Sequence, residues 1–146
     1  MTTTSPLNAR TSTLNILLVE DDDVDVMTVR RAFEKAHILN PLYVASNGLE
    51  ALEKLRSGEI PHERRLVLLD LNMPRMNGIE FLRALRKDPS LCQTPVVVLT
   101  TSTMDRDKFD AYGMNIAGYL VKPVTFDAFC DLMVTLNKYW TLVELP

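Results

Sequence analysis

Charged and hydroxyl side chains follow four apolar runs in this sequence of 146 residues. One run ends at Asp70, and the others lead to Glu20 with Asp21, to Thr100 and to Lys122. Carboxylate oxygens are ligands that suit Mg²⁺, whereas a hydroxyl and an ammonium suit the oxygens of a phosphate group. If these side chains lie together, they can bind Mg²⁺ and a phosphoryl group, with Asp70 as the nucleophile that becomes an acyl phosphate.

Each of these residues also has an ordinary structural explanation. Asp70 alone fits the cap of a following helix, Thr100 fits a strand end, and Lys122 fits a solvated surface. Among the four acids that begin at Glu20, Asp22 suits a helix N-cap, and its neighbours are favoured by the helix dipole. Because five residues of the types that phosphate chemistry needs end consecutive apolar segments, the pattern favours one joint site over separate explanations.

Strand and helix patterns alternate five times along the chain. Short apolar runs predict strands at 14–19, 42–45, 66–69, 95–99 and 118–121. Apolar residues at helical spacing predict helices from the N-cap Asp22 to about 36, and at 49–57, 78–87, 105–113 and 126–139. Right-handed crossovers then give an α/β fold, a doubly wound five-stranded parallel sheet with helices on both faces, whose carboxyl edge carries the site.

Composition limits the classes of partner and compartment. With 16 Lys and Arg against 19 Asp and Glu the net charge is −3, so no direct nucleic-acid partner is expected. Cys92 and Cys130 are too few for a disulfide framework and have no metal-ligand spacing. No signal peptide or membrane span is predicted, which indicates a cytoplasmic protein without membrane contact. We expect a flexible tail at 1–13, one domain at 14–139 with a polar surface connection at 59–65, and a second tail at 140–146.

Four motifs resemble those of a response regulator receiver domain of two-component signalling, over Asn15 to Lys138. They are Leu17-Leu18-Val19-Glu20-Asp21, Leu69-Asp70-Leu71-Asn72-Met73-Pro74 with Gly78, Val98-Leu99-Thr100-Thr101, and Gly118-Tyr119-Leu120-Val121-Lys122-Pro123.

The resemblance implies a flavodoxin-like sheet of order 2-1-3-4-5. It also implies that Asp70 accepts phosphate from a histidine kinase or phosphotransfer protein, with Thr100 and Lys122 assisting. Mg²⁺ would be held by Asp21, Asp70 and the Asn72 carbonyl, with Glu20 acting through water, and the peptide bond before Pro123 would be cis. Thr100 and Tyr119 would form the switch on the surface of the fourth helix, fifth strand and fifth helix. For Tyr119 an ordinary half-buried strand aromatic stays open as the alternative.

A narrower resemblance is to single-domain regulators paired with phytochrome-type histidine kinases. It depends on the long loop before the third strand, on Thr100-Thr101-Ser102 and on the ending 139–146. Since few residues follow the last predicted helix, the effect of phosphorylation is expected to pass to a separate protein or through a homodimer. Trp140, Leu142, Val143 and Leu145 either fold back over that helix or pack on a second subunit.

Two other functions are weighed against this signalling switch, whose only catalysis would be its own phosphorylation and slow dephosphorylation. Asp70-Leu71-Asn72 resembles the Asp-x-Asp motif of haloacid-dehalogenase-like phosphohydrolases, but an amide at Asn72 cannot act as their general acid, and the chain lacks room for a cap domain. The other alternative is a receiver fold that is never phosphorylated and serves only for interaction. Because all five family site residues are present, nothing in the site favours it.

Overall fold

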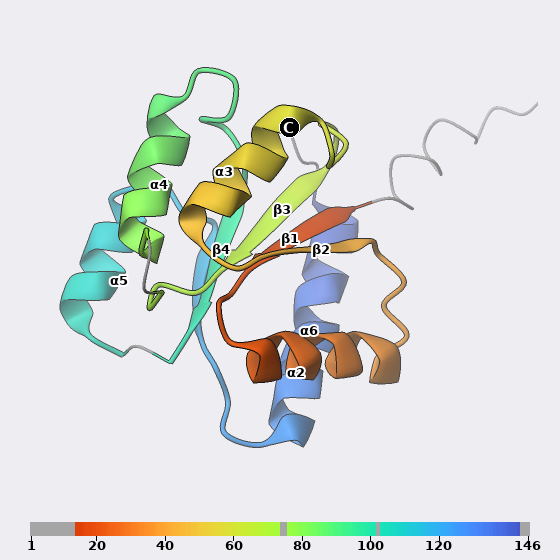
Figure 1. Ribbon diagram of the computed structural model, residues 1–146. Coiled ribbons are helices and arrows are strands. Elements are labelled where there is room, and N and C mark those ends of the chain that lie inside the picture. The colour runs from red at the N-terminus through yellow and green to blue at the C-terminus, as the bar shows by residue number, and fades with distance from the viewer. Residues whose placement is uncertain (1–13, 74–75, 102, 144–146) are drawn as a thin grey trace, which may run out of the picture.

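Five parallel strands form one sheet in the order β2-β1-β3-β4-β5. The computed structural model describes residues 14–73, 76–101 and 103–143 (Figure 1). The strands are β1 (Asn15–Val19), β2 (Leu42–Ala45), β3 (Arg65–Leu69), β4 (Val96–Thr100) and β5 (Gly118–Val121). The predicted α/β architecture and strand order are therefore confirmed.

Helices cover both faces of the sheet. They are α2 (Asp23–Lys35), α3 (Gly48–Ser57), α4 (Gly78–Lys87), α5 (Asp105–Tyr112) and α6 (Phe126–Leu142). In Figure 1 α2 and α6 lie on one side of the sheet and α3, α4 and α5 on the other. Two apolar clusters correspond to these two sides, one including Leu52, Phe81 and Ala111 and the other including Val29 and Met133.

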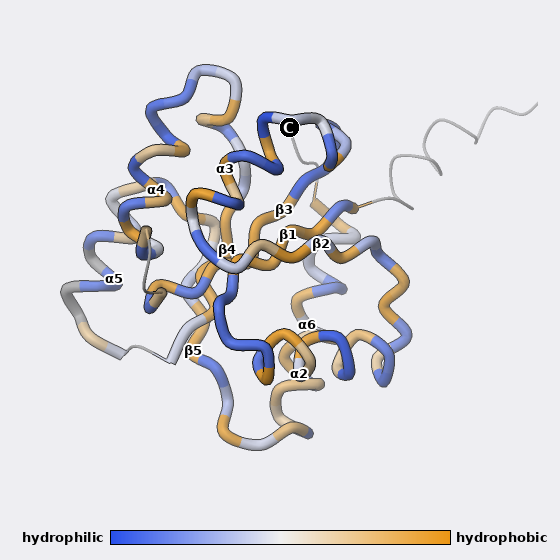
Figure 2. Tube along the Cα trace, in the orientation of Figure 1, coloured by the Kyte–Doolittle hydropathy of each residue, from blue (hydrophilic) through white to orange (hydrophobic). Residues whose placement is uncertain are grey.

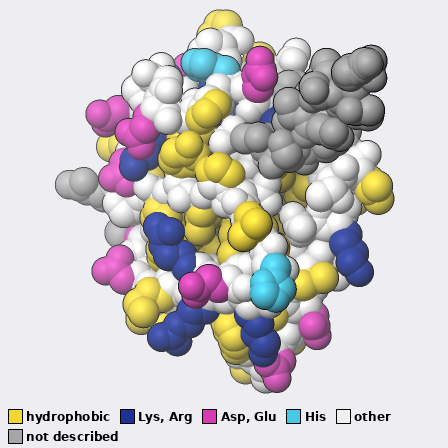
Figure 3. All heavy atoms as spheres, turned by 90° about the vertical axis from the view of Figure 1, so that its right-hand side faces the viewer, with side chains coloured by type: hydrophobic (Ala, Val, Ile, Leu, Met, Phe, Trp, Pro, Cys, Tyr) yellow, Lys and Arg dark blue, Asp and Glu magenta, His cyan; other side chains and the backbone are white. Residues whose placement is uncertain are grey.

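The apolar runs of the sequence become strands that are covered on both faces. Every residue of β1, β3 and β4 is buried, and these strands form the orange centre of the tube in Figure 2. Both faces of a parallel sheet carry crossover helices, so its central strands need apolar side chains in both directions. The edge strand β2 is mostly half-buried, and Figure 3 shows hydrophobic side chains interspersed with charged ones on that side of the molecule.

Helix α6 continues beyond its predicted end at Tyr139 to Leu142. Trp140, predicted to begin a tail, is a helical residue with only 4% of its surface exposed, and it belongs to the apolar cluster under α2 and α6. The helix therefore continues past its predicted end, with Trp140 buried in that cluster, and the division into a domain and a tail stays a prediction. Leu145 lies outside the described residues.

Arg86 of α4 joins the two loops that lead into β4 and β5. Its guanidinium donates to the carbonyl oxygens of Cys92 and Thr94 on one loop and of Met114 and Asn115 on the other, at 2.7 to 3.2 Å. Because β4 carries Thr100 and β5 leads to Lys122, these bonds fix the backbone that positions two of the predicted site residues.

Among the described helices, none has the length and apolar character needed to cross a membrane.

Candidate functional site

Three carboxylates converge at the carboxyl edge of the sheet. β1 and β3 are neighbours, with Val19 opposite Leu69, so the residues that follow them lie side by side. One ligand oxygen from each of Glu20, Asp21 and Asp70 lies within 4.8 Å of the others. Glu20 and Asp70 are buried at 3% and 7% exposure, whereas Asp21 is exposed to solvent.

Asp70 is held in place through one of its carboxylate oxygens. The Thr100 hydroxyl, fully buried at the end of β4, donates to Asp70 Oδ1 at 2.8 Å, and the backbone N–H of Asn72 donates to the same oxygen at 3.2 Å. Asp70 Oδ2 lies 3.7 Å from Lys122 Nζ. The nucleophile predicted from the sequence is therefore oriented by β4 and by its own following turn.

Lys122 makes shorter contacts with two other acids. Its Nζ donates to Glu20 Oε2 at 2.7 Å and to Asp25 Oδ2 at 3.1 Å. Burial by itself lowers the pKa of Lys122, but the hydrogen bond and charge of Glu20, the charge of Asp70 and the bond to Asp25 outweigh it and raise this pKa. Lys122 is therefore a charged donor, held between β1, β3 and α2.

Asp25 is a residue of this site that sequence reasoning missed. It lies in the first turn of α2, which begins after the N-cap Asp22, whose side chain accepts from the N–H groups of Val24 and Asp25. The N-cap explanation proposed for one of the acids thus applies to Asp22. In the sequence, Asp25 is only one of several acids at the start of the helix. The helix dipole already explains acids there, so nothing distinguishes Asp25 from its neighbours.

Glu20 has a raised pKa of about 7. Burial is the largest cause, Lys122 opposes it through a hydrogen bond and its charge, and the neighbouring Asp70 carboxylate adds to the rise. Three carboxylates and one ammonium leave an excess of negative charge at the cluster. A hard divalent cation with oxygen ligands suits this donor set, since it would neutralise that excess.

Two further predicted features lie close to the site. Tyr119 lies on β5 opposite Val98 of β4, is half-buried, and packs against the apolar cluster on the side of α3, α4 and α5.

The peptide bond before Pro123 is trans, since the described residues contain no cis bond, so the expectation of a cis bond is wrong for this structure. Trans is the intrinsically preferred isomer of such bonds. Pro74 and Ser102, part of the quoted motifs, lie outside the described residues.

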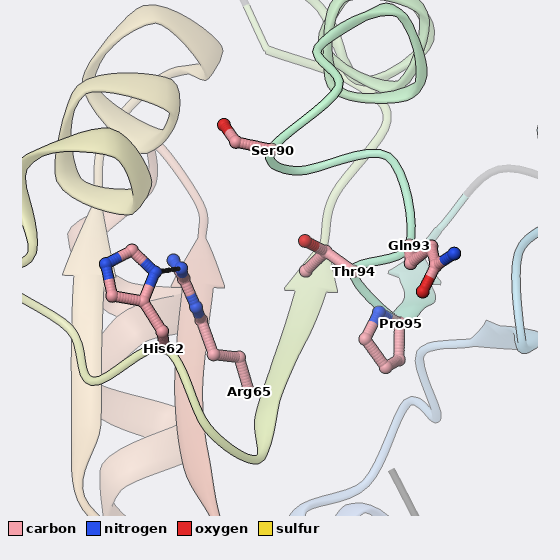
Figure 4. Close-up of a pocket in the computed structure, with 6 residues that line it drawn as sticks. All are labelled: His62, Arg65, Ser90, Gln93, Thr94 and Pro95. Carbon is pink, nitrogen blue, oxygen red and sulfur yellow. Dashed lines mark hydrogen bonds between the residues drawn. The ribbon is translucent and has the colours of Figure 1, made fainter. Parts of the chain in front are cut away.

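A separate pocket opens at the opposite, amino-terminal edge of the sheet. It has a volume of about 210 Å³, and Figure 4 shows the residues that line it, which are His62, Arg65, Ser90, Gln93, Thr94 and Pro95. Arg65 is bonded to His62 and donates to the Leu55 carbonyl oxygen at 3.0 Å. Because that carbonyl lies near the C-terminus of α3, where the helix dipole favours a cation, the buried charge of Arg65 has a structural explanation.

Comparisons with known proteins agree with this geometry. The family model of the response regulator receiver domain matches residues 16–133. The probable methanogenesis regulatory protein FilR2 of Methanothrix harundinacea is 38% identical over 130 residues, which are 86% of this chain and 82% of that protein. The response regulator Rcp1 of Synechocystis is 34% identical over 135 residues, which are 90% of this chain and 92% of Rcp1.

Solved structures show the same similarity in three dimensions. The phosphorylated cyanobacterial phytochrome response regulator RcpA matches with a TM-score of 0.82 at 29% identity, over 92% of this chain and 99% of that chain. The Mn²⁺-bound form of Rcp1 matches with a TM-score of 0.78 at 34% identity, over 91% of this chain and 99% of that chain. The family model matches most of the chain, the sheet has the expected strand order, and an acidic cluster lies at its carboxyl edge. This chain therefore belongs to the response regulator receiver domain family.

Proposed function

We propose that this protein is a phosphorylation-dependent signalling switch in which Asp70 accepts a phosphoryl group from a histidine kinase. One observation carries the proposal: a buried carboxylate at the end of β3 is bonded by Thr100, faces Lys122 and lies within a cluster of three acids. In the reaction, the bond between phosphorus and the donor nitrogen breaks while a bond between phosphorus and an Asp70 oxygen forms. Water later cleaves the acyl phosphate and restores the carboxylate.

The residues around Asp70 have separate roles in this proposal. The Thr100 hydroxyl and the Lys122 ammonium donate to phosphoryl oxygens, and the Asn72 N–H keeps the acceptor oriented. Glu20, Asp21 and Asp70, with the Asn72 carbonyl, would hold Mg²⁺, which when bound neutralises charge on the transferred group. The Mn²⁺ in the Rcp1 structure supports a divalent cation in this family.

The switch itself would use the surface of α5, β5 and α6. Thr100, drawn toward a phosphoryl group, would leave space into which Tyr119 of the neighbouring strand turns. Val121 and Tyr112, exposed at 44% and 54%, belong to that surface and would contact a partner or a second copy in a homodimer. The similarity to the phytochrome response regulator RcpA supports a phytochrome-type kinase as the phosphodonor.

Labelling with a small phosphodonor tests the acceptor. With Mg²⁺ and acetyl phosphate, the wild-type protein is expected to gain one acid- and base-labile phosphoryl group, and Asp70→Asn none, because an amide is not a nucleophile for this reaction. Asp131→Asn on the exposed side of α6 carries the same change of charge and serves as the control. Wild-type labelling of Asp70→Asn would overturn the assignment. Sedimentation with and without beryllofluoride tests the homodimer in the same samples.

A further inference from the structure

The Lys122 ammonium is shared between the acceptor site and helix α2. Its Nζ lies 2.7 Å from Glu20, 3.1 Å from Asp25 and 3.7 Å from Asp70, so only the first two distances are hydrogen bonds. The Lys122 side chain is 12% exposed, whereas that of Asp25 is 41% exposed. The amine that faces the phosphoryl acceptor is therefore bonded to an acid outside the three-carboxylate cluster.

Asp25 differs from the other acids at the start of α2. Asp22 accepts from two backbone N–H groups as the N-cap, and Asp21 belongs to the carboxylate cluster. Asp23 is exposed in the same first turn and makes none of the ion pairs found among the described residues. Within this turn Asp25 alone is bonded to Lys122, and its side chain joins α2 to the residue that follows β5.

We propose that Asp25 is a positioning residue that stabilises the unphosphorylated state by binding Lys122. The inference depends on the function proposed above. Glu20 and Asp25 use two of the three donors of the ammonium and hold Nζ 3.7 Å from Asp70, beyond hydrogen-bond distance. A phosphoryl group on Asp70 adds anionic oxygens that attract the ammonium toward Asp70, so the bond to Asp25 opposes that movement. The strength of the Asp25 bond thus sets part of the difference in free energy between the two states.

Neutralising Asp25 should favour the phosphorylated state. In Asp25→Asn the competing charge is lost, so moving the Lys122 ammonium to the phosphoryl oxygens costs less free energy. With Mg²⁺ at saturation, we expect beryllofluoride to bind Asp25→Asn about two- to fivefold more tightly than the wild type, the effect of one partly exposed ion pair. Asp23→Asn removes the same charge from the same helix turn and should leave the affinity unchanged. Asp25→Glu restores the charge and should bring the affinity back toward that of the wild type.

A Lys122→Gln background separates positioning from simple repulsion. If Asp25 acts through Lys122, the gain produced by Asp25→Asn disappears when Lys122 is replaced. If Asp25 only repels the incoming anion, the gain persists, and this outcome overturns the proposal.

A measurement without metal or phosphate analogue tests the contact itself. In NMR spectra of the metal-free protein, the Lys122 ammonium protons should exchange with water faster in Asp25→Asn than in the wild type or Asp23→Asn.

The outcomes separate this inference from the proposed function. Equal beryllofluoride affinities and equal exchange rates in Asp25→Asn and Asp23→Asn would overturn the role of Asp25 while leaving Asp70 as the acceptor. A wild-type protein that binds no beryllofluoride in the presence of Mg²⁺ would overturn the proposed function, and the positioning role would fall with it.

Discussion

Thr100 Oγ1 lies 2.8 Å from Asp70 Oδ1, and this hydrogen bond joins the ends of two adjacent strands inside the protein. Both residues are buried, with Thr100 at 0% and Asp70 at 7% exposure. A bond from a neutral hydroxyl to a buried carboxylate belongs to the stronger class of protein hydrogen bonds. It also holds the hydroxyl beside the carboxylate that is proposed to accept the phosphoryl group.

Thr100→Val should weaken both the domain and its switch. Valine has the shape of threonine without the donor, so we expect the free energy of unfolding in urea to fall by about 1.5–3 kcal/mol at pH 7. The response of the Tyr119 ring signals to beryllofluoride in NMR spectra should also be lost. Thr100→Ser keeps the donor and should keep the Tyr119 response, and a normal response in Thr100→Val would contradict the role of Thr100.

The raised pKa of Glu20 predicts a dependence of stability on pH in the absence of divalent cations. In the folded state Glu20 has a pKa of about 7 and keeps its proton up to that pH, whereas in the unfolded state it releases the proton near pH 4.5. Between these values the folded state binds more protons, so the free energy of unfolding falls as pH rises, by at most about 1.4 kcal/mol per pH unit.

Thermal unfolding in a chelator checks this sign. As the pH rises from 5 to 7, the Tm of the wild type should fall relative to the Tm of Glu20→Gln. Added Mg²⁺ should reverse the shift, and its affinity should rise with pH across the same window, because the proton and the cation compete for Glu20. A difference in Tm that is independent of pH would contradict the raised pKa.

Gly78 is expected to be essential for the geometry of the turn after Asp70. A Cβ at this position would lie 2.6 Å from the Cα of Leu71 and 2.8 Å from the carbonyl oxygen of Asp70, so the backbone of the acceptor turn would have to move. We expect Gly78→Ala to lower the free energy of unfolding by about 1–3 kcal/mol and to weaken Mg²⁺ binding measured by calorimetry. Gly118→Ala is the matched control, because a Cβ there meets no atom within 4 Å.

Trp140 should stabilise the isolated chain rather than only a dimer. Because it is buried at 4% exposure, Trp140→Ala is expected to lower the free energy of unfolding by about 3–5 kcal/mol. Trp140→Phe should cost less, since the buried indole N–H has no hydrogen-bond partner to lose among the described residues. Leu142→Ala, at a side chain that is 86% exposed, should change stability by less than about 0.5 kcal/mol. Unfolding curves at several protein concentrations separate monomer stability from association.

The sequence predicted the convergence of the site because of a topological rule. Parallel strands present their carboxyl ends at one edge, so residues that follow β1, β3, β4 and β5 had to meet there. The contact of Asp25 with Lys122 could not be predicted in this way. It depends on the direction in which the first turn of α2 leaves β1, and several acids occupy that turn.

The end of helix α6 has only a weak signal in the sequence. The segment from Val124 to Leu145 contains neither Gly nor Pro, so it has no strong stop signal, and the helix continues until burial of Trp140 is complete. The isomer of the bond before Pro123 was expected from resemblance alone. No residue type in the motif specifies it physically, and it is trans.

The ion pair between Glu20 and Lys122 joins positions 102 residues apart. During translation the acids and the acceptor are made first, and Lys122 is added only after all five strands have been synthesised. Before that point, the nascent chain carries the acids of the site without the Lys122 ammonium that pairs with them. On the proposed function, competence to receive a phosphoryl group therefore arises late in biosynthesis, when the fifth strand docks.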